Sequence, residues 1–406
     1  MRIGVIGGGA AGMVAAITAK RNGAEAVILE AKDRLGQKIL VTGNGRCNLG
    51  NLELNMTKYY GRDLSVPEAC LNEFGTEETI RFFQDLGLVI KDRDGYLYPY
   101  CEQASVVLDI LRSEVAALGI NVLLNHTVNG IQVCKKGGFL IDGQHFDRIV
   151  LACGGKANVK GDAHGSGYDL AKELGHKIIP LVPALTFLKC EGEYWKALAG
   201  VRTHGKISLM DTQGNVLAMD CGELQLTEQG LSGIPCFQIS RVAGYALRDK
   251  KRIKVNVDFL PELSMEEIRA MSKNRLVLRK NRTIEEYFTG ILNKKIMQVL
   301  IRQAGLKGSD AAEKVSEGKL EDVLFKAKGF ETYVSGTGDF QHAQVCAGGI
   351  DFGQVTNSLE SKLVKGVYFA GELLDIDGKC GGYNLQWAWT SGYLAGKNAA
   401  EGDDKG

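Results

Sequence analysis

The feature that most restricts the fold of this chain is the hexapeptide GGGAAG at residues 7–12, which separates a short apolar segment from a helix-forming run. Gly7, Gly9 and Gly12 match the spacing G-x-G-x-x-G. In this pattern the first glycine permits a tight turn, the second lets the backbone approach a pyrophosphate, and the third lets helix and strand pack closely. The segment therefore predicts a βαβ unit that binds the phosphates of a dinucleotide at a helix N-terminus.

An acidic residue follows at the position where such a unit binds ribose. The segment AVILE at residues 26–30 is predicted to be the second parallel strand, and it ends in Glu30. A carboxylate at this point accepts hydrogen bonds from a ribose diol and repels a 2′-phosphate, so FAD or NAD is favoured over NADP. The helix between the strands is expected to pack closely through a face of small residues, namely Gly12, Ala15, Ala16, Ala19 and Gly23.

Segments near the C-terminus have the same pattern as the N-terminal unit. Residues 149–155 (IVLACGG) and 367–372 (VYFAGE) are predicted to be buried strands that end in glycines and an acid, and 385–400 a helix with a small-residue face. The middle of the chain is first rich in short β segments and then helical. The sequence thus predicts an α/β domain formed by residues 1–185 and 343–406, interrupted by an inserted β-plus-helix domain at 186–342.

Helix starts are predicted from capping residues. In the inserted domain, two serine or threonine residues are followed three positions later by glutamate, which is the pattern of a capping box. In the α/β domain, two polar residues stand directly before helical runs. The predicted N-caps are Thr76, Ser264 (with Glu267), Thr283 (with Glu286) and Asn384.

Composition argues against several other classes of protein. The net charge is +1 and no basic stripe is present, so nucleic acid is not an expected partner. No apolar run approaches the roughly 20 residues of a membrane helix, and the N-terminal segment lacks the features of a signal peptide, so we expect a cytoplasmic protein without membrane contact. The ten cysteines include no CxxC pair and the six histidines no HExxH motif, so no metal site is expected.

Four longer motifs resemble those of one known family. The motifs GQKILVTGNGRCNLGN (36–51), LACGGKANVKGD (151–162), FAGELLDIDGKCGGYN (369–384) and GGYNLQWAW (381–389) are similar to segments of the NAD(P)/FAD-dependent oxidoreductases of the aminoacetone oxidase and bile-acid reductase (BaiN/RdsA) type. The resemblance covers nearly the whole chain. It implies one FAD, a glutathione-reductase-like Rossmann FAD domain, and an insertion composed of a β-barrel (about 186–262 and 329–342) and a helical part (about 263–328).

The resemblance also implies a role for the unusual segment TGNGRCN. In that family this loop wraps the cofactor, so Gly43 and Gly45 would allow close backbone approach, and Arg46 and Asn48 would supply donors toward the phosphates or the flavin. Cys47 would have a packing or flavin-adjacent role, because the Cys-x4-Cys pair of the disulfide reductases is absent. A redox role for this thiol is the alternative.

The segment CGGYN is expected to stabilise charge on the flavin. Backbone N–H groups of Gly382, Tyr383 and Asn384 at a helix N-terminus would face the pyrimidine edge of the ring, where reduction places negative charge. The full set of expected FAD contacts is Gly7, Gly9, Ala10, Ala11, Gly12, Glu30, Ala31, Gly36, Lys38, Gly43, Gly45, Arg46, Cys47, Asn48, Val128, Ala152, Gly154, Gly371, Glu372, Gly382, Tyr383 and Asn384.

The resemblance implies hydride transfer through flavin N5, and three functions remain open. The preferred one is an NAD(P)H-linked reductase of a conjugated carbon–carbon double bond in an apolar oxo substrate such as an oxo bile acid or steroid. The second is an amine oxidase of the aminoacetone type that uses oxygen. The third is a flavin-binding sensor or RNA-modification accessory protein, with the basic run RLVLRKNRT at 275–283 as its contact surface. A solvated helix face is the simpler explanation of that run.

The sequence assigns no catalytic residue. His164 and His342 lie in segments that the family places near the active site, but a lone histidine is more often a surface or pocket residue. Tyr96, Tyr98 and Tyr100 alternate along an extended segment, which is compatible with a pocket wall and with ordinary strand packing. The chain has only one dinucleotide fingerprint, so we expect NAD(P)H as a transient donor and a small molecule as substrate, and no oligomeric state is indicated.

Overall fold

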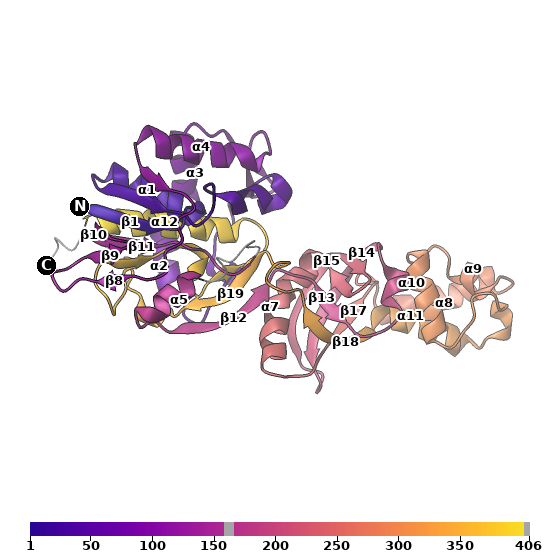
Figure 1. The fold of residues 1–406 in the computed structure, drawn as a ribbon. Helices are drawn as coiled ribbons and strands as arrows, with labels where there is room; N and C mark the ends of the chain where they lie inside the picture. Colours follow the sequence, from indigo (N-terminus) through magenta and orange to yellow (C-terminus); the bar gives the residue numbers. More distant parts are fainter. Residues whose placement is uncertain (158–165, 402–406) are drawn as a thin grey trace. The chain divides into compact units, whose positions relative to one another are not determined.

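The computed structural model describes residues 1–157 and 166–401, which form two compact units (Figure 1). One unit consists of Met1–Val182 together with the chain from Gln344 onward, and the other of Pro183–Ala343. The predicted domain boundaries, at 185/186 and 342/343, lie close to these. We refer to the first as the Rossmann unit and to the second as the barrel unit.

A parallel sheet forms the centre of the Rossmann unit. Its strands, in spatial order, are β20 (Val367–Phe369), β11 (Arg148–Leu151), β1 (Arg2–Ile6), β2 (Glu25–Leu29) and β7 (Asn121–Leu123). Residues 3–6 of β1 lie opposite residues 26–29 on one side and 148–151 on the other. The carboxyl ends of all five strands lie at one edge, so the loops that follow β1, β2, β11 and β20 meet there. The predicted Rossmann fold is confirmed.

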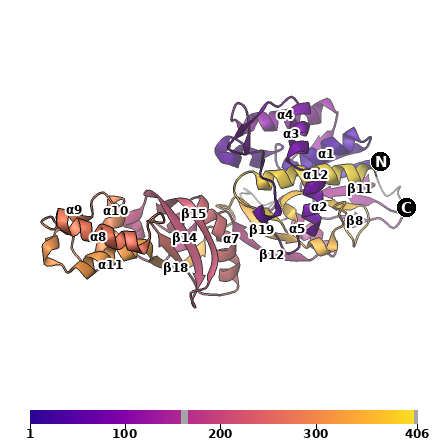
Figure 2. The same ribbon diagram turned by 180° about the vertical axis from the view of Figure 1, so that it is seen from behind.

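Two helices from opposite ends of the chain, α1 (Ala10–Arg21) and α12 (Tyr383–Glu401), lie side by side (Figures 1 and 2). Their backbones approach closely because glycines of α12 face α1. A Cβ atom on Gly392 would lie 2.4 Å from the carbonyl oxygen of Ala11, and one on Gly396 would lie 2.2 Å from that of Ala15. The small residues predicted on both helices therefore permit a contact that larger side chains would prevent.

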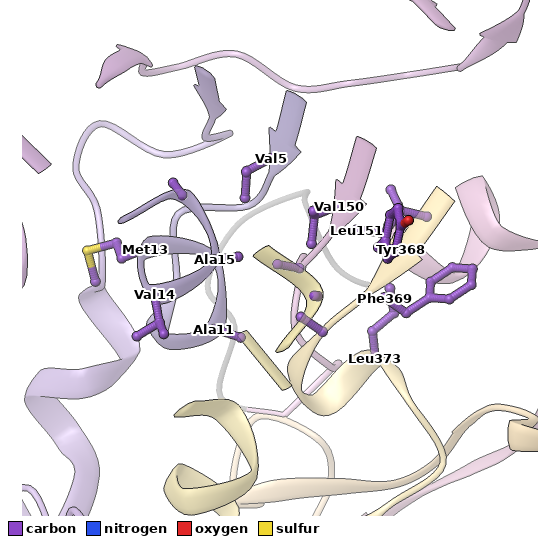
Figure 3. Packing of buried hydrophobic residues seen from close by; sticks show 14 of the residues in the cluster. Val5, Ala11, Met13, Val14, Ala15, Val150, Leu151, Tyr368, Phe369 and Leu373 are labelled. Carbon is purple, nitrogen blue, oxygen red and sulfur yellow. The ribbon is translucent and has the colours of Figure 1, made fainter. Parts of the chain in front are cut away.

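The core of the Rossmann unit lies where α1 packs against the sheet (Figure 3). Val5 of β1, Val150 of β11 and Phe369 of β20 are completely buried, as are Met13 and Val14 of α1. Strands covered on both faces contain nearly continuous apolar runs, and this is the pattern of the three strands. Burial of this core fixes the position of the sheet edge at which the loops converge.

Smaller elements complete the Rossmann unit. Short antiparallel sheets pair β3 with β6 and β5, β4 with β21, and β8, β9 and β10 with one another, and β12 pairs with β19. The bounds are η1 (Gln37–Gly45), β3 (Gly50–Asn51), η2 (Met56–Lys58), β4 (Tyr59–Tyr60), α2 (Ser65–Glu73), α3 (Thr76–Asp85), β5 (Ile90–Arg93), β6 (Tyr96–Pro99), α4 (Ala104–Ala117), β8 (Gln132–Val133), β9 (Phe139–Ile141), β10 (Gln144–Phe146), α5 (Ser166–Glu173), β12 (Ile178–Ala184), β19 (Val345–Ile350), η4 (Phe352–Gln354), η5 (Gly371–Leu373) and β21 (Asp377–Gly378).

The barrel unit contains a closed six-stranded barrel, which confirms the predicted β-barrel (Figure 2). Burial alternates along β17 and β18, so one side chain in two points into the barrel. The strands in order around the barrel are β13 (Leu188–Cys190), β16 (Gly230–Ser232), β15 (Val216–Thr227), β14 (Arg202–Asp211), β17 (Ile253–Asp258) and β18 (Phe330–Thr337).

Helices accompany the barrel and form the predicted helical part of the inserted domain. Capping boxes at Ser264 and Thr283 start α8 and α9, as predicted, because each side chain accepts the N–H three residues on and each glutamate bonds back to the cap. The bounds are α6 (Trp195–Leu198), α7 (Ile234–Arg248), α8 (Met265–Arg279), α9 (Ile284–Phe288), α10 (Lys294–Gln303), η3 (Ala312–Lys314) and α11 (Glu317–Lys328).

The predicted cap at Thr76 is wrong by one residue. Gly75 is the N-cap of α3, and its N–H donates to the Glu78 carboxylate at 2.9 Å. The Thr76 hydroxyl instead donates to the carbonyl oxygen of Asn51 at 2.8 Å and is buried. A tertiary hydrogen bond has therefore replaced the local one that the sequence suggested.

The close contact between α1 and α12 predicts a strong effect of adding one methyl group. Gly396→Ala should lower the free energy of unfolding by about 1–3 kcal/mol, because its Cβ atom would overlap the backbone of α1. Gly130→Ala is the matched control in the same unit, since a Cβ there meets nothing within 4 Å, and it should change stability by less than about 0.5 kcal/mol. Urea unfolding followed by circular dichroism measures both, and equal midpoints would contradict the packing described.

Candidate functional site

The turn between β1 and α1 has the geometry of a phosphate cradle. Gly7 has a φ of +103°, and a Cβ atom on Gly12 would lie 1.8 Å from its carbonyl oxygen, so both positions require glycine. A Cβ atom on Gly9, in contrast, would meet nothing within 4 Å. The N-cap of α1 is Gly9, which has no side chain that could cap the helix. The N–H groups of its first turn are thus free to stabilise an anion.

Glu30 fixes this turn from the neighbouring strand. It directly follows β2 and is only 9% exposed. One carboxylate oxygen accepts the N–H of Gly8 at 2.6 Å, and the other accepts that of Lys32 at 2.9 Å. Each oxygen retains a lone pair, so the carboxylate can still accept hydrogen bonds from ribose hydroxyls.

An ion pair connects the loops that follow β2 and β20. Lys38 Nζ lies 2.7 Å from Glu372 Oε2, and Glu372 Oε1 accepts the N–H of Cys346 at 2.6 Å. The side chains are 35% and 18% exposed, so the pair is only partly solvated. It holds Glu372 in one orientation at the carboxyl end of β20.

Gly371 brings the end of β20 against the start of α1. Its φ is +75°, and a Cβ atom on it would lie 3.1 Å from Ala11 Cβ. Two side chains of α12 bind its peptide groups: its N–H donates to Ser391 Oγ at 2.8 Å, and its carbonyl oxygen accepts Trp387 Nε1–H at 3.1 Å. Neither Trp387 nor Ser391 was among the site residues predicted from the sequence. Their spacing of four residues places them on one helix face, and this spacing is the sequence feature that could have indicated them.

The glycine-rich segment at the end of η1 has several residues with a left-handed backbone. Gly43, Asn44, Gly45 and Cys47 have φ values of 55°, 55°, 82° and 59°. Such a run places successive N–H groups on one side of the chain and can form an anion-binding concavity. The conformation explains the unusual composition of the segment, because glycine and asparagine adopt it at little cost.

Cys47 is completely buried in this segment. Burial raises the pKa of its thiol to about 12, and a hydrogen bond with Thr42 only partly opposes this. A thiol with that pKa stays protonated at neutral pH and is a poor nucleophile. The environment supports the packing role over the redox role.

Arg46 and Asn48, two of the expected donors, have partners within the protein. The Arg46 Nε atom lies 3.5 Å from a carboxylate oxygen of Glu102, and the arginine side chain is 51% exposed. The Asn48 side chain is buried, and in the amide orientation that satisfies both of its polar atoms its nitrogen donates to the carbonyl oxygens of Gly50 and Leu97 at 2.8 and 3.2 Å. In this structure both side chains therefore bind the protein itself, and Asn48 holds the segment onto β3 and β6.

The backbone before α12 comes into contact with β3. Gly382 has a φ of +94°, and a Cβ atom on it would lie 2.6 Å from the carbonyl oxygen of Gly50. α12 begins at Tyr383, so Asn384 lies in its first turn and is not the predicted N-cap. The Asn384 side chain instead accepts the N–H of Gly378 and donates to its carbonyl oxygen, both at 2.8 Å. The first-turn N–H groups of α12 lack intrahelical acceptors.

The three alternating tyrosines share the less buried face of their strand. Tyr96 and Tyr98 lie on β6, and Tyr100 follows it with 67% exposure. A Cβ atom on Gly381 would lie 3.0 Å from the Tyr96 ring and 3.2 Å from the Tyr383 ring. Two aromatic rings thus flank the backbone directly before α12.

Five further predicted contacts lie in loops or at the start of α1. Ala10 and Ala11 form the first turn of that helix. Ala31 is partly exposed and Val128 is buried. Gly36 has a φ of +71° and donates its N–H to the Gly8 carbonyl oxygen at 2.9 Å.

The loop after β11 supplies Ala152 and Gly154. Ala152 packs against the turn at Gly7, because a Cβ atom on Gly7 would lie 2.5 Å from the carbonyl oxygen of Ala152. Gly154 has a φ of +71°, and a Cβ on it would meet nothing within 4 Å. Among the described residues, space therefore lies open beside this loop as well as beside Gly9.

Of the two candidate histidines, one lies in the part of the chain that the structure describes. His164 lies outside the described residues. His342 belongs to the barrel unit, where its Nδ1 atom lies 2.7 Å from the Asp339 carboxylate on an exposed surface.

FAD fits the residues at this sheet edge. The open space at Gly9 suits a pyrophosphate, the oriented carboxylate of Glu30 suits a ribose, and the first turn of α1, whose N-cap Gly9 has no side chain, supplies N–H donors. The fold and this site define a Rossmann-type, FAD-dependent oxidoreductase. The chain belongs to the family described as "HI0933-like protein Rossmann domain", which matches residues 1–398.

Similar proteins match along nearly the full chain. The 3-dehydro-bile acid Δ(4,6)-reductase of Clostridium scindens is 44% identical over 408 residues, with 98% of this chain and 99% of that protein covered. A ribosomal RNA dihydrouridine synthase of Haemophilus influenzae is 27% identical, with 96% of each chain covered. Among solved structures, a 3-ketosteroid-Δ4-(5α)-dehydrogenase of Rhodococcus jostii RHA1 is 15% identical with a TM-score of 0.47, and 98% of this chain and 96% of that one are covered.

The sequence argued against nucleic acid as a partner, against a membrane helix and against a metal site. A relative named for an RNA substrate means that membership in the family does not exclude nucleic acid as a partner. Within residues 1–157 and 166–401, no helix has the length and apolar character needed to span a membrane. In the same part of the chain, no three metal-ligating side chains of His, Cys, Asp or Glu are grouped to hold an ion.

The open space at Gly9 predicts a variant that separates folding from cofactor binding. Gly9→Val should fold normally, because its side chain enters free space, but should lose most bound FAD, because that space is where the pyrophosphate fits. Gly130→Val, at another open position, should keep its FAD. Visible absorbance per chain and the thermal unfolding midpoint of the cofactor-free proteins measure the two effects. A Gly9→Val protein as yellow as the wild type would refute the assignment.

The buried thiol predicts that Cys47 is chemically silent. Cys47→Ser should keep FAD and most turnover, and iodoacetamide should leave Cys47 unmodified in the native protein at pH 8, four units below its pKa of about 12. Peptide mass spectrometry and steady-state kinetics measure these outcomes. Loss of a thiol-dependent charge-transfer band in the variant would instead establish a redox role.

Proposed function

We propose that this enzyme reduces a carbon–carbon double bond conjugated with a ketone in a steroid-like substrate such as an oxo bile acid, with NAD(P)H as a transient electron donor. The observation that carries the proposal is the 44% identity to a bile-acid reductase over 98% of this chain. Because the match runs through both units, it includes the cofactor site and the whole inserted barrel unit.

The 44% identical relative and a more distant one are named for the same type of bond change. A dihydrouridine synthase and a Δ(4,6)-reductase both saturate a ring carbon–carbon double bond, although their substrates differ greatly in size. In uracil and in a 3-oxo-Δ4 ring this bond is conjugated with a carbonyl group, which makes its distal carbon accept hydride. The shared chemistry favours a reductase over an amine oxidase.

Bound FAD would supply the hydride at N5, and the residues of the Rossmann unit would position and polarise it. The first turn of α1 would hold the pyrophosphate, and Glu30 would bind the adenine ribose. Lys38 keeps the Glu372 carboxylate in place at 2.7 Å, so that it can bind the ribityl chain. The remaining predicted contacts are proposed to line the same cofactor.

The N-terminus of α12 is proposed to stabilise negative charge at the pyrimidine edge. The N–H groups of Gly382, Tyr383 and Asn384 lie at or just before its first turn, where a helix end carries partial positive charge. Donors aimed at developing charge are worth about 3 kcal/mol in comparable oxyanion sites. The partly exposed face of β6 is placed beside this helix start by the Tyr96–Gly381 contact, so Tyr96 is a candidate wall of the substrate site.

A two-step anaerobic experiment tests the proposed function. Mixing the holoenzyme with NADH or NADPH should bleach the oxidised flavin, and a 3-oxo-Δ4 steroid added next should restore the visible absorbance. Mass spectrometry should find the steroid with two added hydrogens. Uridine-containing ribosomal RNA and aminoacetone are the competing substrates to be tested in parallel.

Each alternative has its own outcome. Bleaching by aminoacetone with rapid reoxidation in air, and none by either nicotinamide, would establish the oxidase. Reoxidation by RNA and not by steroid would place this chain with the dihydrouridine synthases. Either result would overturn the proposal and leave the FAD site intact.

A further inference from the structure

A cysteine, a histidine and a glutamate form a linked cluster on the outer face of the barrel. The Sγ atom of Cys221 on β15 lies 4.0 Å from Nε2 of His204 on β14. The Nδ1 atom of the same histidine lies 2.8 Å from a carboxylate oxygen of Glu262, in the loop between β17 and α8. The imidazole and the carboxylate are 56% and 66% exposed, and Cys221 is exposed as well.

The register of the barrel brings these side chains together. His204 is paired with Glu223 and Lys206 with Cys221, so Cys221 is the diagonal neighbour of His204 on the same face of the sheet. Gly205, between the two β14 residues, is buried, as expected if its neighbours point outward. The cluster thus depends on the closed barrel and not on a flexible loop alone.

The contact with Glu262 defines what His204 can do. A carboxylate beside Nδ1 accepts a hydrogen bond from the Nδ1–H group, so the neutral imidazole presents the lone pair of Nε2 to the thiol. A base that faces a nucleophile and is oriented by a third group is the arrangement that activates cysteine and serine nucleophiles. His204 can therefore take the proton of Cys221.

Other charged groups surround the cluster without closing it off. Lys206 lies directly opposite Cys221 and supports negative charge on sulfur. Glu223 lies opposite His204 and is 3.5 Å from Arg202. On the neighbouring strand, the Asp258 carboxylate is held by Lys328 at 2.7 Å, and α7, which packs on β15, presents Pro235 toward Gly222.

The other cysteines provide a contrast within the same protein. Burial raises the pKa of Cys70, Cys153, Cys190 and Cys346 to about 12, so these thiols react slowly. Cys101 is the other exposed cysteine in the described part of the chain, and it follows Tyr100 at the end of the β6 segment. The reactivity of Cys101 therefore serves as an internal reference for that of an exposed thiol for which the described residues show no histidine contact.

We propose that Cys221 is a site of reversible thiolation by small disulfides, with His204 as the general base and Glu262 as its positioning residue. The Cys221 sulfur, after His204 takes its proton, attacks one sulfur of R–S–S–R and forms Cys221–S–S–R. The original S–S bond breaks, and the leaving R–S⁻ takes the proton from His204 Nε2 and departs as a thiol. Cys221 is oxidised and the leaving group is reduced, so no further oxidant is needed.

Glutathione disulfide is the probe that tests the proposal on the holoenzyme. At pH 7 the Cys221 peptide should gain glutathione at least about tenfold faster than the Cys101 peptide of the same molecules, because general-base assistance is worth that much or more. His204→Gln should reduce this ratio to near one, and Glu262→Gln should give an intermediate ratio. Quantitative peptide mass spectrometry over time measures both sites, and Cys221→Ser confirms the assignment of the peptide.

Two results would overturn the inference. Equal rates at Cys221 and Cys101 in the wild type would mean that exposure alone controls reaction, and an unchanged ratio in His204→Gln would mean that the histidine takes no part. All three exchanged side chains are exposed, and circular dichroism checks that the barrel remains folded. The outcome is independent of which substrate the flavin site reduces.

Discussion

The contact on which the rest of the Rossmann unit depends is the close approach of α1 and α12. Glycines 392 and 396 leave no space for a side chain against the backbone of Ala11 and Ala15. Because α12 then lies beside the fingerprint helix, its side chains Trp387 and Ser391 can bind Gly371. The site is assembled from the two ends of the chain because these two positions are glycine. Close packing then permits only this arrangement of the two helices.

The charges at the sheet edge are arranged so that each carboxylate already has partners. Glu30 accepts two backbone N–H groups, and Glu372 accepts one N–H and an ammonium. Hydrogen bonds to charged groups contribute roughly 1.5–3 kcal/mol each, which offsets the cost of partial burial. Both acids are thereby fixed in orientation, and each keeps lone pairs that can accept further hydrogen bonds. Such preorganisation lets the site bind a cofactor without reordering its own side chains.

Much of the fold could be predicted because local signals and tertiary contacts agree. Some of these signals depend on residues only a few positions apart, such as the capping boxes at Ser264 and Thr283. Others, such as the glycine pattern at residues 7–12 and Glu30, belong to a standard βαβ unit. Where a tertiary partner competes, the local signal failed: Thr76 binds Asn51, and Asn384 binds the Gly378 turn. The expected donors Arg46 and Asn48 also bind other protein groups, and their contacts with FAD stay a prediction. The Cys221–His204–Glu262 cluster gave no sequence signal, since only the barrel register unites it.

The central claim is that one FAD lies along this sheet edge, between the N-terminus of α1 and that of α12. A crystal structure of the yellow holoenzyme tests it most directly. We predict that the pyrophosphate lies over Gly9, that the adenine ribose binds Glu30, and that the pyrimidine edge of the flavin faces the N–H groups of Gly382 and Tyr383. A flavin whose pyrimidine edge points away from α12, or a pyrophosphate bound away from Gly9, would contradict the account.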